Sequence, residues 1–213
     1  GSPGALVDTA LIDVIEPNLS FTKDMGPLVN GRVPITLVLS NIGGNAPAFD
    51  IVITDVLDGG IWDLASIAAD NIPSGFLFNE ITGGGSTTVE ISSDPAGSSP
   101  DNSIEPGEQI TFVFSALLRT DVTLPNPVLN SATVTEINSL PGVDTSERDY
   151  SDLSDNASLG FSELDSTKAD VLLVDLNTNG QANPGDTIRY TIEIDNNGTC
   201  LLYTSDAADD LFR

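Results

Sequence analysis

The clearest pattern in the chain is an alternation of apolar and polar residues over 33–57, which predicts two β-strands. Every second residue from Val33 to Leu39 is apolar, so one face of the first strand suits a protein core. A polar turn at 41–45 follows, rich in the Asn and Gly residues that accept the positive φ of a tight connection. The alternation resumes at Phe49, which predicts a second strand with one buried face.

The opening half of this pattern returns near the C-terminus as DTIRYTIEIDNNG, residues 186–198. Aligning the two turns places Leu39 on Ile194 and Gly43 on Gly198. A second copy so far along the chain indicates a tandem array in which each repeat has its own core.

A weaker internal match sets the domain boundaries, because residues 5–17 resemble 154–164 at an offset of 147 positions. Both segments are interpreted as closing strands, each followed by a new opening strand. The sequence then predicts the last strand of a preceding repeat at 1–17, a complete repeat at 18–165, the start of a third at 166–199, and a tail at 200–213.

The tail beginning at Cys200 breaks the pattern of the final hairpin directly after its turn. Its sequence, CLLYTSDAADD, resembles a translated sequencing adapter. An ordinary acidic tail is the alternative. The tail is therefore left out of the fold prediction.

Frequent turn residues and the absence of a sustained period of 3.6 predict an all-β fold, and the spacing of the predicted strands suits a two-sheet β-sandwich. A short helical turn is expected at 63–70, beside the only Trp, and polar loops at 93–107 and 138–154. The predicted strands of the complete repeat are 19–23, 33–40, 47–55, 76–81, 86–92, 109–118, 130–137 and 155–162, and the next repeat opens with 169–176.

Composition excludes several classes of function. The chain has 32 acidic and 7 basic residues, a net charge of −25, which repels nucleic acid and anionic lipid. No apolar run is long enough to span a bilayer. With no His and one Cys, His-dependent triads, most zinc sites and an intramolecular disulfide are excluded.

Several short motifs recur at turns and strand ends: Thr22-Lys23, Asn41-Ile42-Gly43, Thr54-Asp55-Val56-Leu57, Asn130-Ser131-Ala132-Thr133-Val134 and Pro184-Gly185-Asp186. Together they resemble the immunoglobulin-like domain of unknown function number eleven, a repeat of large bacterial surface proteins. The resemblance implies an immunoglobulin-like β-sandwich in tandem array and a secreted or surface-anchored structural role. The first repeat departs from the pattern by having Val29-Asn30-Gly31 where the second has the usual Pro-Gly-Asp turn, although Pro106-Gly107-Glu108 supplies such a turn elsewhere.

A candidate calcium loop lies between the two strands of the last repeat. Its pattern, D-x-N-x-N-G-x5-D, places oxygen ligands at alternate positions, with a Gly for the sharp bend. An Asp at the twelfth position supplies fewer oxygens than the usual Glu, so weak binding is expected. An ordinary Asn- and Gly-rich turn is the alternative. The predicted ligands are Asp175, Asn177, Asn179, Gln181 and Asp186.

A second candidate site consists of Lys23, Asp55 and Asn130, which share the alternation phase of core residues on three predicted strands. Inward polar groups are costly unless they satisfy one another. The arrangement resembles the isopeptide-forming domains of bacterial pilins and adhesins. That resemblance implies an amide bond from Lys23 to Asn130, assisted by a buried Asp55. An ordinary ion pair of Lys23 is the alternative, as is a strand register shifted by one residue. The second repeat is expected to lack this bond, with Val174 at the lysine position.

Two groups of acidic residues lie in predicted loops, and paired carboxylates at a suitable separation are the catalytic groups of glycoside hydrolysis. With one Trp and three Tyr, aromatic sugar platforms are scarce, and a solvated or calcium-bridged surface is favoured. The groups are Asp144, Glu147, Asp149, Asp152 and Asp155, and Asp94, Asp101, Glu105 and Glu108.

These observations predict a non-catalytic stalk or adhesin repeat of a large secreted or cell-surface bacterial protein. Its partners would be neighbouring repeats of the same chain and, beyond them, surface glycans or proteins. The alternative is a calcium-dependent ligand- or carbohydrate-binding accessory module of an exported enzyme. Neither nucleic acid nor membrane insertion of this segment is expected.

Overall fold

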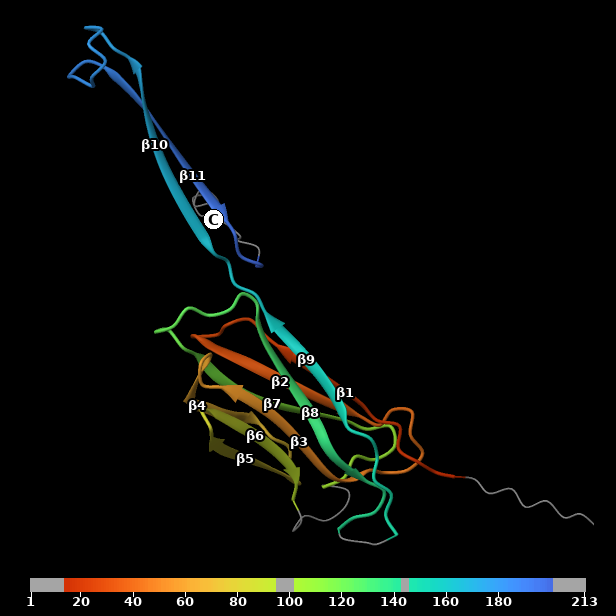
Figure 1. Cartoon of the computed structure of the whole chain (residues 1–213). Helices are drawn as coiled ribbons and strands as arrows, with labels where there is room; N and C mark the ends of the chain where they lie inside the picture. Colours follow the sequence, from red (N-terminus) through yellow and green to blue (C-terminus); the bar gives the residue numbers. More distant parts are fainter. Residues whose placement is uncertain (1–13, 95–101, 143–145, 201–213) are drawn as a thin grey trace, which may run out of the picture. The chain divides into compact units, whose positions relative to one another are not determined.

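The computed structural model describes residues 14–94, 102–142 and 146–200, and all regular secondary structure there is β-strand (Figure 1). The predicted all-β class is confirmed. The chain divides into two compact units. The first unit takes in the residues up to 124 together with 129–158, and the second takes in 125–128 and the residues from 159 onward.

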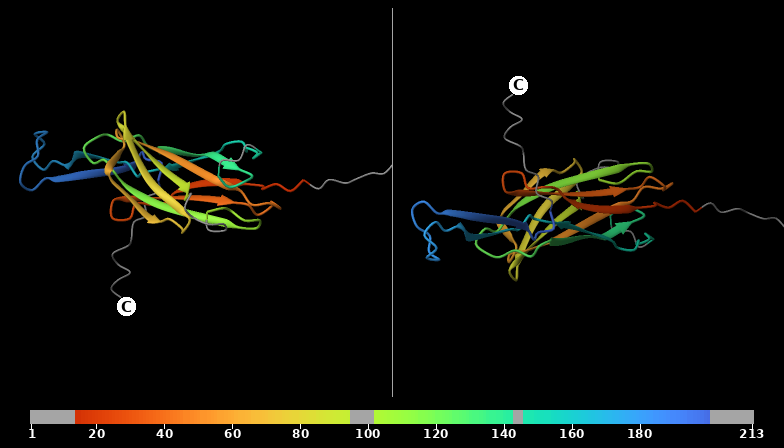
Figure 2. Two further views of the ribbon diagram at one scale, coloured as in Figure 1. Left: turned by 90° about the horizontal axis from the view of Figure 1, so that it is seen from below. Right: turned by 90° about the horizontal axis from the view of Figure 1, so that it is seen from above.

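The first unit is a sandwich of two antiparallel sheets (Figures 1 and 2). The four-stranded sheet has the order β1 (Ser20–Met25), β2 (Arg32–Ser40), β7 (Gln109–Leu118) and β4 (Trp62–Asn71). The five-stranded sheet has the order β5 (Phe76–Gly83), β6 (Ser86–Ser93), β3 (Phe49–Asp58), β8 (Val128–Asn138) and β9 (Leu153–Leu159).

This strand order is immunoglobulin-like. The first, second and seventh strands form one sheet with β4 at its edge, and the third, eighth and ninth strands are neighbours in the other. Immunoglobulin domains distribute their A, B, E, D strands and their C, F, G strands in the same way. The chain therefore crosses between the sheets after β2, β3, β4, β6 and β7.

The core lies between the sheets and is filled by the alternating residues that the sequence identifies. The apolar row of β2, from Val33 to Leu39, is fully buried. Aromatic rings join the two layers, since Phe112 of β7 meets the edge of Phe76 of β5 with ring centroids 4.9 Å apart. The period of two thus specifies which face of each strand the sandwich buries.

The Asn-Gly turn after β2 is ordered by a buried side chain. The Asn41 amide donates to the carbonyls of Ala46 (2.9 Å) and Ile104 (3.1 Å), and its oxygen accepts from the Asn18 N–H (2.9 Å). A Cβ at Gly44 would lie 1.9 Å from Asn41 Oδ1, so this position has no room for a side chain. The turn needs both its Asn and its Gly.

The predicted helical turn at 63–70 is wrong, because these residues belong to β4. Trp62 is 2% exposed and pairs with Leu118 of β7, and the pairing is irregular between Asp63 and Ala68. The segment is rich in residues with good helix propensity, but burial of the Trp and pairing along β7 override that preference.

The remaining differences are at strand ends. The expected closing strand at 1–17 is not seen in its described part, since residues 14–17 form no strand and 1–13 lie outside the described residues. The predicted strand 155–162 corresponds to β9, which starts two residues earlier and ends at Leu159.

The second unit contains a two-stranded antiparallel hairpin of β10 (Leu164–Val174) and β11 (Thr187–Asn196). The opening strand begins five residues before the predicted start at 169. Large apolar residues of the hairpin are exposed within the described part of the chain, among them Tyr190, Ile192 and Ile194 of β11. Two strands alone do not enclose a core.

The burial pattern predicts unequal costs for one substitution at two sites. Leu39→Ala removes a side chain that is 0% exposed, and it should lower the free energy of unfolding by about 2–5 kcal/mol. Leu129→Ala is the matched control, because Leu129 is 64% exposed, and its effect should stay within about 0.5 kcal/mol. Urea denaturation of both variants measures the difference, and equal losses would contradict the assigned core.

Candidate functional site

Three polar side chains lie in the core of the first unit. Lys23 is 6% exposed, Asp55 1% and Asn130 7%. Each follows the phase of the buried residues on its own strand, as the sequence predicts: Lys23 on β1, Asp55 on β3 and Asn130 on β8. A register shifted by one residue, one of the two alternatives, would have placed them outside.

The strand register brings the three residues to one place between the sheets. Asp55 pairs with Ala132, so Asn130, two residues away, lies on the same inner face of the five-stranded sheet. Lys23 approaches from the opposite sheet, where it pairs with Leu37. Its Nζ donates to Asp55 Oδ2, and the two form an ion pair that connects the sheets.

The hydrogen bonding of this cluster is incomplete. The Asn130 side chain lies beside the Asp55 carboxyl and favours its charged form, but Asp55 Oδ1 and Asn130 Nδ2 are buried without a hydrogen bond of good geometry. A buried polar atom without a partner costs about 1–3 kcal/mol. The sequence therefore maintains an expensive group of polar atoms where apolar side chains would pack more cheaply.

Burial favours the neutral forms of both charged groups. Desolvation lowers the pKa of the Lys23 amine, and this effect outweighs the opposing influence of Asp55 and Asp155. Desolvation likewise raises the pKa of the Asp55 carboxyl, against the influence of Lys23 and Asn130. A neutral amine is a nucleophile and a protonated carboxyl is a hydrogen-bond donor, so both pKa shifts are in the direction that acyl chemistry between these groups would need.

Asp155 is a fourth member of the site, which the sequence analysis assigned to an acidic loop. Its Oδ2 accepts a hydrogen bond from the Lys23 backbone N–H at 2.8 Å. This bond and one from Asn156 lower the pKa of the Asp155 carboxyl. It also holds β9, at the edge of the five-stranded sheet, against β1 of the other sheet (Figure 1). The sequence offered one signal for this inward position, because Asp155 has the same alternation phase as the buried residues Ala157 and Leu159.

The predicted calcium loop is folded around its own backbone. Asp175 Oδ2 accepts from the Gly180 N–H at 2.7 Å, and Gly180 has a positive φ of 76°. Asp186 closes the loop by accepting from the N–H groups of Leu176 (2.9 Å) and Asn183 (2.8 Å). The side-chain oxygen of Asn177 accepts from the Asn179 N–H, and the side-chain oxygen of Asn179 accepts from the Gln181 N–H.

This donor set fits calcium only in part. Asp175 Oδ1 is buried and without a partner, which suits a ligand oxygen. Both oxygens of Asp186, however, already accept backbone hydrogen bonds. Among the described residues there is no group of three or more acidic, His or Cys side chains placed to hold a metal. Calcium binding therefore remains a prediction, and the self-closed turn is the alternative.

Three described members of the two acidic groups already have hydrogen-bond partners within the first unit. Glu105 and Glu108 belong to one turn, where Glu108 Oε2 accepts from the Glu105 N–H at 2.8 Å. Asp155 is bound to Lys23, as described above. Asp101 and Asp144 lie outside the described residues.

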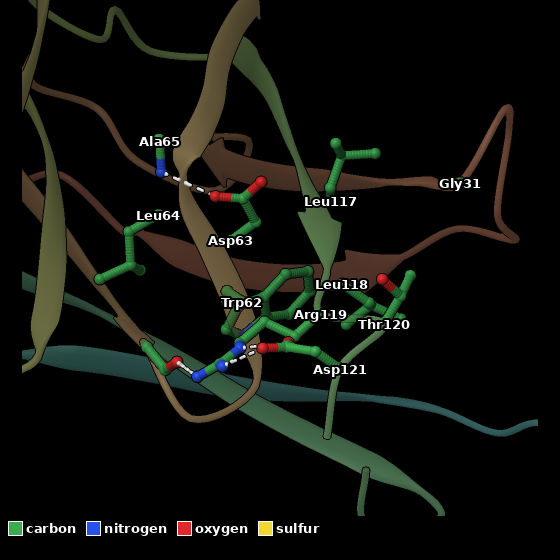
Figure 3. A pocket seen from close by; sticks show the side chains of 11 residues that line it. Gly31, Trp62, Asp63, Leu64, Ala65, Leu117, Leu118, Arg119, Thr120 and Asp121 are labelled. Atoms are coloured by element: carbon green, nitrogen blue, oxygen red, sulfur yellow. Dashed lines mark hydrogen bonds and ion pairs between the residues drawn. The ribbon is translucent and has the colours of Figure 1, made fainter. Parts of the chain in front are cut away.

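An open groove of about 580 Å³ lies at one end of the first unit, beside Trp62 (Figure 3). Arg119, its one lining cation, donates to both oxygens of Asp121 (2.9 and 2.6 Å) and to the Gly59 carbonyl (3.0 Å). The guanidinium is thus already paired, and the Trp62 ring is buried. The groove offers neither a free cation nor an exposed aromatic ring as a platform for a sugar.

The sequence matches no family model and no curated protein. Among solved structures, it is similar to GH20 exo-β-N-acetylglucosaminidase from Vibrio harveyi, with 12% identity over 65% of this chain and a TM-score of 0.36. The chain spans 18% of that protein's length.

Two further similar structures are nearer in length to the chain. ACE19, the collagen binding subdomain of the Enterococcus faecalis surface protein ACE, has 11% identity, 69% coverage of this chain and 100% of its own, and a TM-score of 0.35. A type I cohesin–dockerin complex from Clostridium thermocellum has 14% identity, 70% and 98% coverage, and a TM-score of 0.32. The fold assignment above rests on strand order and register.

The part of the chain that the structure describes contains no helix of the length and apolar character that a bilayer crossing requires.

The loop of the second unit predicts weak calcium binding that depends on its two carboxylates. Calcium should bind the wild-type chain, and Asp175→Asn should abolish binding, because it removes the charge that offsets dehydration of the cation. Asp195→Asn, an exposed position on β11, is the matched control and should bind as the wild type does. Isothermal titration measures all three. Equal heats for the three proteins, or no heat with wild type, would favour the self-closed turn.

Proposed function

We propose that this chain is part of a non-catalytic stalk of a large secreted or cell-surface bacterial protein, and that its first unit locks itself with an amide bond between Lys23 and Asn130. The observation that carries this proposal is the burial of Lys23, Asp55 and Asn130 together between the two sheets. Such a group is costly for a module held only by packing. It is useful if it reacts.

The proposed reaction needs only the chain itself. The neutral Lys23 amine attacks the side-chain carbonyl carbon of Asn130, while the protonated Asp55 donates a hydrogen bond to the carbonyl oxygen and stabilises the charge that develops there. Asp55 then transfers the amine proton to the departing amide nitrogen. The new C–N bond forms, the bond to Nδ2 breaks, and one ammonia leaves.

The product would lower the electrostatic cost of the site. A neutral secondary amide replaces a buried amine and a carboxamide whose nitrogen has no partner. The bond also closes a loop from Lys23 to Asn130, 107 positions along the chain. If this tie acts on the unfolded chain as a disulfide of similar loop length does, it stabilises the unit by about 4–5 kcal/mol.

The position of the bond suits a module under tension. Lys23 is on the first strand of the unit and Asn130 is on its eighth. A pull on the two ends of the unit would then pass through the covalent bond, and most of the sandwich would carry no load. The repeated strand pattern of the second unit supports a chain of such modules, whose partners are the neighbouring repeats.

The alternative of a carbohydrate-binding accessory module is less well supported. Sugar recognition commonly uses exposed aromatic rings, and Trp62 is buried beneath the groove that it lines. The net charge of −25 suits a solvated extracellular surface. We therefore assign the acidic loops to solubility rather than to a glycan site.

The bond predicts a mass defect in the folded protein. The intact wild-type chain should weigh less than its sequence by one ammonia, without any added enzyme or cofactor. Asp55→Ala should have the full sequence mass and remain folded, because proton transfer and carbonyl activation are lost while the sheets keep their apolar rows. Intact mass spectrometry with circular dichroism measures both properties.

Asp24→Ala provides the control, since Asp24 neighbours Lys23 on β1 but faces solvent. This variant should keep the mass defect. A wild-type protein of full sequence mass would refute the bond and leave Lys23 as a buried, ion-paired lysine.

A further inference from the structure

The hairpin of the second unit repeats the strand pairing of the β1–β2 hairpin in the first unit. Lys23 pairs with Leu37 in β1–β2, and Lys168 pairs with Ile192 in β10–β11. Leu37 and Ile192 are equivalent under the alignment of the two turns, 155 positions apart. Because Lys168 pairs with the counterpart of Leu37, it occupies the position of Lys23. The opening strands are thus offset by 145 positions and the second strands by 155.

A hydrogen bond in the turn supports the same offsets independently. In the first unit, Asn41 Oδ1 accepts from the backbone N–H of Asn18 at 2.9 Å. In the second unit, Asn196 Oδ1 accepts from the backbone N–H of Glu163 at 3.1 Å. The acceptors are 155 positions apart and the donors 145.

These offsets correct the expectation that Val174 stands at the lysine position. Val174 pairs with Thr187 at the far end of the hairpin, well beyond the site. The sequence comparison missed this because the strand connection is ten residues longer in the second repeat. The longer β10 and the loop at 175–186 take the place of the short connection at 26–31.

Lys168 lies on the apolar face of its hairpin, as Lys23 does. Its Nζ is 4.4 Å from the centre of the Tyr190 ring, so the amine lies over the same face as Ile192 and Ile194. The difference is in what covers the face. Leu37 is 0% exposed beneath the five-stranded sheet, whereas its counterpart Ile192 is 66% exposed.

We infer that Lys168 is the attacking lysine of a second cross-link, and that the apolar face of β10–β11 is covered by a sheet presenting an inward aspartate and asparagine as β3 and β8 do. This inference rests on the proposed function of the first unit. We assign a covering sheet of this kind because the apolar row of β11 corresponds in register to that of β2. In the first unit, the row of β2 is covered by the five-stranded sheet. The chemistry is unchanged: the Lys168 amine bonds to the asparagine side-chain carbon, and ammonia leaves.

One difference affects the fit of the covering sheet. β10 has Ser166 and Asp170 where β1 has Phe21 and Met25, as the pairings of both hairpins show. Both residues of β1 are buried. A sheet taken from the first unit would therefore leave unfilled volume over β10 unless these two positions are enlarged.

A hybrid protein tests the inference. Residues 1–198 are continued with a second copy of residues 44–160, which joins equivalent positions of the turn and supplies β3 to β9 over the hairpin. A repacked version also carries Ser166→Phe and Asp170→Met. Folding of the second unit is followed by hydrogen exchange of the β11 amides, and bond formation by intact mass.

The repacked hybrid should lack two ammonia molecules, and its Lys168→Arg and Lys23→Arg variants should each lack one. If Lys168→Arg leaves the mass defect unchanged, or if β11 gains no protection, the inference is overturned while the first bond stands. If Lys23→Arg leaves the mass defect of the hybrid unchanged, the bond of Lys23 is refuted and the bond of Lys168 stands. A hybrid of full sequence mass overturns both.

Discussion

The ion pair between Lys23 and Asp55, buried between the two sheets, is the constraint that aligns the reacting groups of this molecule. Each charge alone would be costly in an apolar core, and together they still leave polar atoms without partners. The two side chains meet only when both strands have the correct register, so the pair fixes how the sheets are aligned at this point. A reaction that turns the lysine into a neutral amide would make this arrangement permanent and remove the amine's charge.

The surrounding structure holds the reacting groups from several directions. The buried row of β2 fixes β1 beside it, and Asp155 binds the backbone of Lys23 from the edge of the opposite sheet. Asn130 is positioned by the pairing of β8 with β3. The site therefore depends on long-range strand order, so any change that shifts one strand by a residue would separate the three groups.

The sequence predicted the parts of the fold that depend on alternation. The phase of Val33 to Leu39 identified the buried face of β2, and the same reasoning placed Lys23, Asp55 and Asn130 inside. It failed where tertiary contacts decide: β4 forms because Trp62 is buried against β7, although its sequence favours a helical turn. It grouped Asp155 with the loop carboxylates, although the predicted strand 155–162 begins at this residue, because alternation along one strand does not reveal the contact with the Lys23 backbone. The position of Lys168 required the register of β10 with β11, which a change in loop length conceals.

The most direct measurement of the central claim is to pull the protein from its two ends by single-molecule force spectroscopy. With a covalent tie between Lys23 and Asn130, the 107 positions between them stay closed after the sandwich unfolds. The extended wild-type chain should be shorter than that of the Asp55→Ala variant by about 350–390 Å, at 3.3–3.6 Å per residue. Equal extended lengths for the two proteins would contradict the account.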